Sequence, residues 1–547
     1  MAMGRGGREP AGDGRADDAP VRAPARAAGA AGAPGRARAA AGRIAGAVVV
    51  AASGLLYATL PPSPDQWFLG YTGWRMTEGA IPYQGFADGN WPACHALHAA
   101  SVLLLGNTPY TWRVFDFGIM LVCTAFAALT ARSLWGARAA RWLLVLYPAL
   151  YAVLGRWFAG ERDVVGAHFL FVALWFYWTG ITRRRAAWQV GTGALLALAV
   201  LVKPTFAVFG PLLALHALLA VRASLCPLRE RLAHVLVAGG ASIAALGAAF
   251  ALLFAAGTPP QAFWELAVES IVVRYGNDAA TSGAFLRTFL QYFAKHWHWI
   301  SLGAVLGLGA NLLRREPDSA ARNLLFPTLW LTGLASYLAQ AQGLGYTLGV
   351  SYAATIPILC SGLGLLSFRA PAARGWRRLV VVALVAVPIL GTAKKWSAEF
   401  GSSVRWLTGR ITAQEHYGGF DAGDGISAGE AIALAAELRR AVPEGGTILV
   451  WGRANVINFL AERPQPTRFH HNVVIMRRYL PERLAGKWNA WFHEEVEAAR
   501  PAACLVNEAE LDETPPVPGS IAFLRAYLAA DYVRVRTVGL SGLYLRR

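Results

Sequence analysis

The sequence predicts an α-helical polytopic membrane protein with about eleven transmembrane helices and a small soluble α/β domain at its C-terminus. Composition is the first observation behind this prediction: 55% of the 547 residues are hydrophobic and 15% are charged, whereas soluble domains carry about 25% charged residues. The second is that the apolar residues form separate runs of membrane-spanning character. The third is that clusters of Arg recur in every second segment between these runs.

The N-terminal segment is dominated by Ala, Gly, Arg and Pro and shows no apolar periodicity. Such a composition cannot bury a core, so residues 1–42 are expected to form a disordered basic tail in the cytoplasm. A cleaved signal peptide is disfavoured, because the first apolar run begins only at Arg43. An Arg-rich transit peptide is the weaker alternative.

A transmembrane domain is expected over residues 43–393. The predicted spans lie at 43–60, 112–131, 139–155, 164–181, 187–202, 206–221, 233–256, 297–313, 323–339, 347–367 and 378–393. The basic loops are expected in the cytoplasm, and the alternate loops carry acidic residues. The N-terminus is therefore predicted to be cytoplasmic, and an odd number of crossings places the C-terminus outside the plasma (inner) membrane.

Two outer loops, 61–111 and 257–296, and the C-terminal segment 394–547 are long enough to carry a functional site. Within the first loop, residues 93–106 are apolar but short, which is typical of an interfacial or re-entrant helix. The C-terminal segment combines helical periodicity after Glu430 with β-type runs near residues 447–451 and 503–506. We expect an extracytoplasmic soluble α/β domain there.

Charge and cysteine usage exclude several other classes. The net charge is +18, but the arginines are spread over short interhelical clusters, which disfavours a nucleic-acid partner. The five cysteines are widely scattered and form no CxxC or metal-binding spacing. The paired histidines His95/His98 and His470/His471 have no third ligand nearby in the sequence, and no HExxH motif occurs.

Several polar residues lie at the predicted outer membrane edge. A carboxylate in the acidic, aromatic loop after the first span, such as Asp65, could act as a general base, although an ordinary solvated loop is the simpler interpretation. Lys203 could bind a lipid phosphate or merely extend to the membrane surface. Arg162 and Asp163 could bind a donor or form a local ion pair, and Arg274 with its aromatic neighbour could clamp a phosphate or belong to a surface helix.

The order of these motifs resembles the GT-C superfamily of glycosyltransferases that use lipid-linked sugars, such as bacterial aminoarabinose transferases and protein O-mannosyltransferases. The resemblance covers roughly residues 43–365. It is carried by these residues and segments: Asp65, Gly79 to Tyr83, Asp88, Pro92, Leu105-Gly106, Arg113, Gly160 to Asp163, Leu201 to Thr205, and Gln340 to Tyr346.

This resemblance implies a polyprenyl-phosphate-linked sugar as donor and a glycan, lipid or protein as acceptor, next to membrane lipid. Asp65 matches the family's first-loop acid, which helps to activate the acceptor hydroxyl; Gln66 follows where the family often has a second acid. Asp163 is implied as a second catalytic residue. The implied substrate-binding residues are Asp88, Arg113, Arg162, Lys203, Arg274, Gln342 and Tyr346. A divalent metal ion between Asp65 and Asp163 is compatible with the resemblance, and no other cofactor is implied.

Two other functions remain open at the level of sequence. A polytopic transporter or flippase would be expected to show internal repeats and polar residues at mid-membrane, whereas the polar residues here gather at one edge. An O-antigen ligase or polymerase of cell-envelope glycans would share the topology and the lipid-linked substrate.

Overall fold

The computed structural model describes residues 33–273, 283–292, 297–312, 318–340, 344–365, 391, 394, 396–476, 480–511 and 519–547. The chain divides into two units after Val48. The described residues of the first unit are helical and form the beginning of α1 (Ala33–Ala58). The helix therefore begins inside the segment that we expected to be disordered, because its many Ala residues have a high intrinsic helix propensity.

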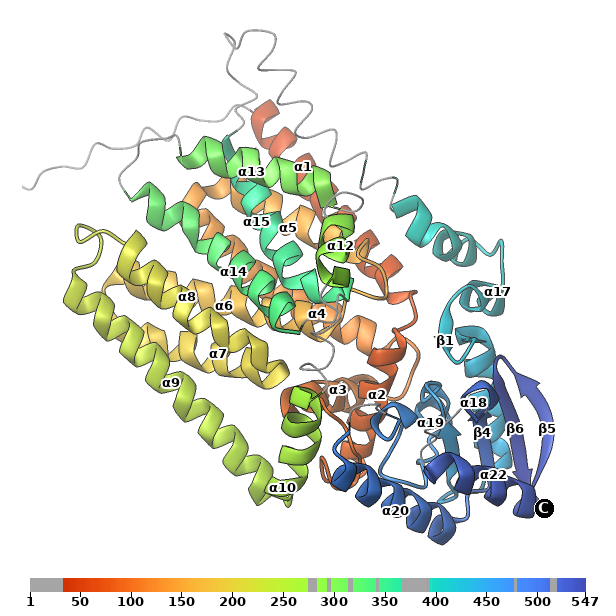
Figure 1. The fold of residues 1–547 in the computed structure, drawn as a ribbon. Helices are drawn as coiled ribbons and strands as arrows, with labels where there is room; N and C mark the ends of the chain where they lie inside the picture. The colour runs from red at the N-terminus through yellow and green to blue at the C-terminus, as the bar shows by residue number, and fades with distance from the viewer. Residues whose placement is uncertain are drawn as a thin grey trace, which may run out of the picture. The chain divides into compact units, whose positions relative to one another are not determined.

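The membrane part of the second unit is built from helices (Figure 1). Its α-helices are α2 (Pro64–Thr77), α3 (Pro92–Leu105), α4 (Thr111–Trp135), α5 (Ala137–Ala152), α6 (Arg162–Arg183), α7 (Gln189–Val202), α8 (Phe209–Leu215), α9 (Leu228–Ala255), α10 (Pro260–Phe263), α12 (Gly283–Tyr292), α13 (His298–Leu312), α14 (Ser319–Gln340) and α15 (Gly349–Leu365). Short helices of other types lie between them: η1 (Ala186–Trp188), η2 (Pro204–Val208), η3 (His216–Ala220), η4 (Trp264–Glu269) and η7 (Gly345–Leu348).

The described residues contain five helices that are long and apolar enough to cross a membrane. They are Ala40–Ala58, Thr111–Trp135, Arg162–Arg183, Leu228–Ala255 and Gly345–Leu365. Shorter apolar helices lie at Pro92–Leu105, Ala186–Val202, Pro204–Ala220 and Ile300–Leu312. The prediction of a helical multi-pass membrane protein is thus confirmed. Each predicted span from 43–60 to 347–367 overlaps a described helix, and the predicted span 378–393 lies, apart from residue 391, outside the described residues.

The loop after the first predicted span, residues 61–111, contains more helix than the sequence indicated. Helix α2 lies in its first half, where we expected a polar and aromatic stretch. The local signals for this helix are strong, because Ser63 and Gln66 form a capping box and Pro64 occupies the first helical position. The short helix expected at 93–106 is present as α3, which begins after a second proline, Pro92.

The C-terminal part is a small α/β fold, as predicted. Its four-stranded sheet has the order β3 (Ile448–Trp451), β4 (Ala503–Asn507), β6 (Ser541–Arg546) and β5 (Tyr532–Val538). Strands β3 and β4 are parallel, whereas β4–β6 and β6–β5 are antiparallel. A hairpin, β1 (Asp421–Gly423) and β2 (Ile426–Ser427), precedes them, and the helices are α17 (Ala413–Gly418), α18 (Ala428–Ala441), α19 (Val456–Ala461), α20 (Glu482–Ala499), α21 (Glu508–Leu511) and α22 (Gly519–Asp531).

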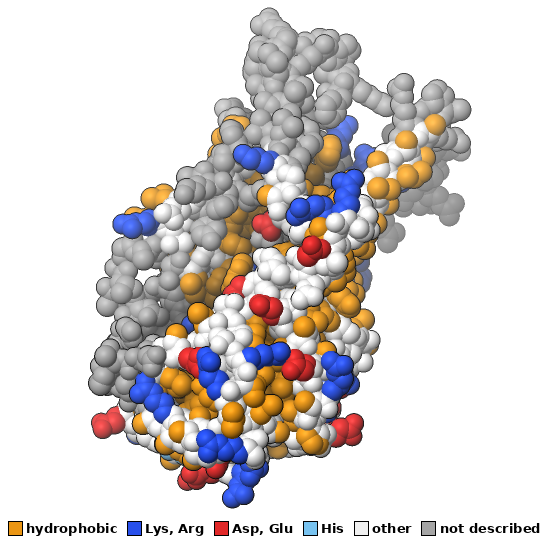
Figure 2. All heavy atoms as spheres, turned by 90° about the vertical axis from the view of Figure 1, so that its right-hand side faces the viewer, with side chains coloured by type: hydrophobic (Ala, Val, Ile, Leu, Met, Phe, Trp, Pro, Cys, Tyr) orange, Lys and Arg blue, Asp and Glu red, His pale blue; other side chains and the backbone are white. Residues whose placement is uncertain are grey.

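The predicted strands near residues 447–451 and 503–506 are β3 and β4, which lie at the centre of the α/β fold. Strands β5 and β6 were not predicted, although the alternation of Val533, Arg534 and Val535 is a period-two pattern. Side chains of β5 remain largely exposed, and Figure 2 shows apolar side chains among the charged ones that gather over the C-terminal domain.

Segments at one end of the membrane helices share hydrophobic cores with the C-terminal domain. Trp67, Tyr71 and Trp74 of α2 belong to one core with residues of α18, α19 and β3. Tyr83 and Phe263 belong to a second core with residues of β3, β4 and α20. These shared cores hold α2 between the membrane helices and the sheet, and the candidate site lies along this helix.

Candidate active site

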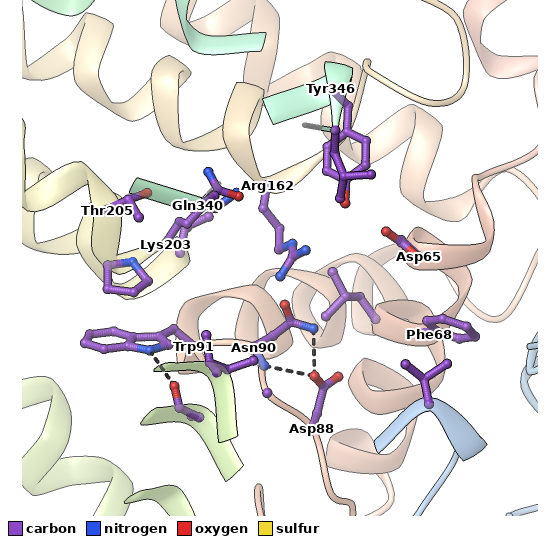
Figure 3. Close-up of a pocket in the computed structure, with 18 of the residues that line it drawn as sticks. Asp65, Phe68, Asp88, Asn90, Trp91, Arg162, Lys203, Thr205, Gln340 and Tyr346 are labelled. Carbon is purple, nitrogen blue, oxygen red and sulfur yellow. Dashed lines mark hydrogen bonds between the residues drawn. The ribbon is translucent and has the colours of Figure 1, made fainter. Parts of the chain in front are cut away.

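A cavity of about 370 Å³ lies where α2, α6, α7 and α14 meet the C-terminal domain (Figure 3). Asp65, Arg162 and Lys203, which come from three different segments, all line it. The other polar or aromatic lining residues are Phe68, Asp88, Asn90, Trp91, Trp157, Thr205, Gln340, Tyr346, Arg453 and His471. The structure thus brings together the first-loop acid and the two cations that the sequence placed at one membrane edge.

Asp65 is presented to the cavity by the first turn of α2. It is the second residue of the helix, after Pro64, and the N-terminal end of a helix favours a negative charge. Neither a hydrogen bond nor an ion pair engages its carboxylate within the described part of the chain. Its carboxylate is therefore available to a substrate that enters the cavity.

Arg162 begins α6 and extends toward the centre of the cavity, between Lys203 and Asp65 in Figure 3. Asp65, Glu161 and Tyr346 all act electrostatically on its guanidinium group. A guanidinium in this position can bind the oxygen atoms of a phosphate with directed hydrogen bonds.

Lys203 lies at the junction of α7 and η2, where Pro204 ends the regular helix. Its ammonium group is 2.7 Å from one carboxylate oxygen of Asp163 and 2.9 Å from the other. The two side chains are 7% and 1% exposed. Asp163, which the resemblance implied as catalytic, does not line the cavity and instead neutralises the buried Lys203.

Asp88 lies on the floor of the cavity and is fixed by its own turn. One of its carboxylate oxygens accepts hydrogen bonds from the backbone and side-chain amides of Asn90, at 2.9 and 2.7 Å. Burial by itself would raise the pKa of Asp88, but His95, His470, His471 and the Asn90 hydrogen bond together lower it. Burial also lowers the pKa of His470 to about 4.

Arg113 has a different environment from the one that the resemblance implied. It is fully buried, and its guanidinium donates to the carbonyls of Pro61, Arg156 and Ala159 and to the hydroxyl of Tyr57. It therefore fixes the segment before α6 and does not line the cavity.

The remaining implied residues divide into two groups. Tyr346 lines the cavity, next to the end of α14. Arg274 and Gln342 lie outside the described residues.

In the described part of the chain, no group of three or more His, Cys, Asp or Glu side chains is arranged to hold a metal ion. Because Lys203 engages both carboxylate oxygens of Asp163, the site does not fit a divalent ion shared by Asp65 and Asp163.

Comparisons with known proteins show which family and which folds the chain resembles. Residues 91–259 match the family model described as dolichyl-phosphate-mannose-protein mannosyltransferase. The fold is similar to that of ArnT from Cupriavidus metallidurans bound to undecaprenyl phosphate, with a TM-score of 0.59 and 16% identity over 93% of this chain and 98% of that chain. For the apo state of the same protein, the TM-score is 0.56 and the identity 14%, over 92% and 98% of the two chains.

The chain thus resembles membrane glycosyltransferases, by sequence over residues 91–259 and by fold over most of its length. Comparison with curated protein sequences gives no significant match.

The C-terminal domain contributes contacts that were not expected from the sequence. The His471 ring stacks on Phe68, with ring centroids 4.6 Å apart, and the His470 ring stacks on Tyr71 at 5.5 Å. The Gln465 backbone amide donates a hydrogen bond of 2.9 Å to the Tyr71 hydroxyl. The adjacent histidines were visible in the sequence, but no local pattern indicates that they pack on a helix some 400 residues earlier in the chain.

Proposed function

We propose that this glycosyltransferase moves a sugar from a polyprenyl phosphate to an acceptor hydroxyl at the extracytoplasmic face of the plasma membrane, with Asp65 as general base. The single observation that carries this proposal is that Asp65, Arg162 and Lys203 line one cavity at the end of the membrane helices. The presence of undecaprenyl phosphate in the similar ArnT structure supports a polyprenyl phosphate as the donor lipid.

The proposed reaction is a single displacement at the anomeric carbon of the donor. The acceptor oxygen forms a bond to this carbon while its proton passes to the Asp65 carboxylate. The bond between the anomeric carbon and the phosphate oxygen breaks, and the polyprenyl phosphate leaves with the electron pair. One displacement inverts the anomeric centre. General-base catalysis of this kind contributes about 10²–10⁴-fold to the rate.

Arg162 and Lys203 are proposed to stabilise the charge that develops on the leaving phosphate. Asp163 already neutralises Lys203 within the protein, so the positive charge that faces the donor comes from Arg162 and from Arg453, which also lines the cavity. The polar lining residues Asp88, Asn90, Gln340 and Tyr346 are proposed to surround the sugar.

The topology proposed for this function is the one expected from the sequence. Eleven crossings, a cytoplasmic N-terminus and an extracytoplasmic C-terminal domain place Asp65 outside the cytoplasm, because the loop before α2 follows the first crossing. A divalent metal ion is not part of the proposal.

The substitution Asp65→Asn tests the assigned base. We expect the turnover number to fall by about 10²–10⁴-fold, because the amide cannot accept the acceptor proton, while donor binding stays unchanged. The measurement is sugar transfer by the purified variant from a radiolabelled polyprenyl-phosphate sugar to cell-envelope extract of a deletion strain. The donor itself is identified by mass spectrometry of polyprenyl-phosphate sugars that accumulate in that strain.

The matched control is Glu78→Gln, which changes an acid at the other end of α2 that does not line this cavity. It should transfer sugar at the normal rate. Normal turnover by the Asp65→Asn protein would remove Asp65 as the base.

A further inference from the structure

A second carboxyl group, that of Glu161, lies next to the proposed base but does not line the cavity. Glu161 is 2% exposed and directly precedes Arg162 at the start of α6. It is the N-cap residue of α6, but its side chain makes no capping hydrogen bond. Instead, one of its carboxylate oxygens accepts hydrogen bonds from the Ser63 hydroxyl at 2.7 Å and from the Gln66 side-chain amide at 2.9 Å.

The two donors flank Asp65 on both sides. Ser63 is the N-cap of α2 and Gln66 is the third residue of the helix, and the two already bond to each other in a capping box. The Gln66 side-chain amide also donates to the carbonyl of Ala159 at 2.9 Å. The first turn of α2 is therefore joined to the start of α6 through the buried Glu161 carboxyl group and to the segment before α6 through the Ala159 carbonyl.

Resting on the proposed role of Asp65, we infer that Glu161 is a positioning residue, which fixes the first turn of α2 against the start of α6 and so sets the separation of Asp65 and Arg162. Asp65 directly precedes Gln66, one of the two hydrogen-bond partners of Glu161, and Arg162 directly follows Glu161. Any loosening of this contact changes the distance between the base and Arg162. Misplacement of reacting groups by about 1 Å can cost about 10²-fold in rate.

The charged and titratable groups around Glu161 come from four elements: Asp65 on α2, Arg113 on α4, Arg162 on α6 and Tyr346 on η7. Burial, followed by the negative charge of Asp65, raises the pKa of Glu161 to about 8. At neutral pH the carboxyl group is therefore protonated, and its carbonyl oxygen still accepts both hydrogen bonds. Above this pH, ionised Glu161 competes with the donor phosphate for Arg162.

Two substitutions of Glu161 separate positioning from a merely structural role. Glu161→Gln keeps the accepting oxygen and imitates the protonated acid, so turnover at pH 7 should stay within about 3-fold of normal. The fall of kcat/KM above about pH 8 that the natural protein should show is expected to disappear in this variant. Glu161→Ala removes the acceptor, and kcat should fall by about 10–100-fold with donor KM nearly unchanged.

Exchanging the acid and the amide between positions 161 and 66 tests the contact between these two side chains directly. Gln66→Glu alone places two acids in hydrogen-bond contact and should lower kcat, whereas Gln66→Glu combined with Glu161→Gln restores one acid and one amide and should recover it. Glu430→Ala is the matched control, because Glu430 also accepts a hydrogen bond from a serine hydroxyl, that of Ser427 at the start of α18, and does not line the cavity. It should leave kcat unchanged.

The outcomes distinguish this inference from the proposed function. If Asp65→Asn is inactive but Glu161→Ala turns over normally, the inference fails and the proposed base stands. If Glu161→Ala does not fold, the pH profile of Glu161→Gln decides, and an alkaline fall of kcat/KM that persists in this variant overturns the inference. A fully active Asp65→Asn protein removes the basis of both.

Discussion

Two aspartates beside the cavity occupy equivalent positions in their helices and have opposite environments. Asp65 is the second residue of α2 and Asp163 is the second residue of α6, so the same end of a helix dipole favours both charges. Asp163 is almost completely buried and holds Lys203 at 2.7 Å. Asp65 faces the cavity and has no such partner within the described residues. The partner, and not the helix position, distinguishes the paired carboxylate of Asp163 from the carboxylate that we propose as the base.

The largest effect on stability is expected from Asp163→Asn. This change leaves the buried ammonium group of Lys203 without its counter-charge, which typically costs about 3–5 kcal/mol. Asp65→Asn should leave stability nearly unchanged, because no intramolecular partner is lost. Thermal unfolding of both purified proteins in detergent measures the difference, and equal unfolding midpoints would contradict the comparison.

A double variant sharpens this prediction. Asp163→Asn with Lys203→Gln replaces the ion pair by two neutral amides and should recover much of the unfolding midpoint, since no buried charge is left unpaired. If Lys203 also binds the donor phosphate, the donor KM of this variant should remain raised by about 10-fold or more. A normal donor KM would confine Lys203 to its structural role.

An intermediate effect is expected where the C-terminal domain holds α2. Tyr71→Phe removes the oxygen that accepts a hydrogen bond from the buried Gln465 amide, and a buried amide left without a partner costs about 1–3 kcal/mol. The substitution should lower the unfolding midpoint and reduce turnover modestly by loosening α2. Trp406→Phe, an aromatic change whose ring contacts are with His416 and Tyr417 of α17, is the matched control for turnover.

The smallest effect is a dependence of stability on pH through His470. Burial lowers the pKa of His470 from 6.5 to about 4, so the folded protein resists a proton that the unfolded chain accepts. The stabilising contribution is therefore complete above pH 6.5 and is lost progressively as the pH falls toward about 4. His470→Gln should reduce the difference between the unfolding midpoints measured at pH 7 and pH 5. An unchanged difference would show that His470 does not couple folding to pH.

Not all of the candidate residues predicted from the sequence line the cavity. Asp65, Asp88, Arg162, Lys203 and Tyr346 line it, because each lies at a helix end or loop on the same edge of the membrane helices. Arg113 lies near the same edge, but its guanidinium turns to backbone carbonyls of the segment before α6. Depth in the membrane can be read from hydropathy, whereas the direction of a side chain around a helix depends on which neighbours pack there.

The sequence by itself determined the multi-pass helical class, the α/β character of the C-terminal domain and the edge at which the polar residues gather. These follow from local quantities, namely apolar run length, charge between runs and short-range periodicity. Only the tertiary structure decided that Lys203 neutralises Asp163, that Glu161 bonds to the residues flanking Asp65, and that His470 and His471 pack on α2. Each of these contacts joins segments far apart in the chain, so no local pattern could specify it.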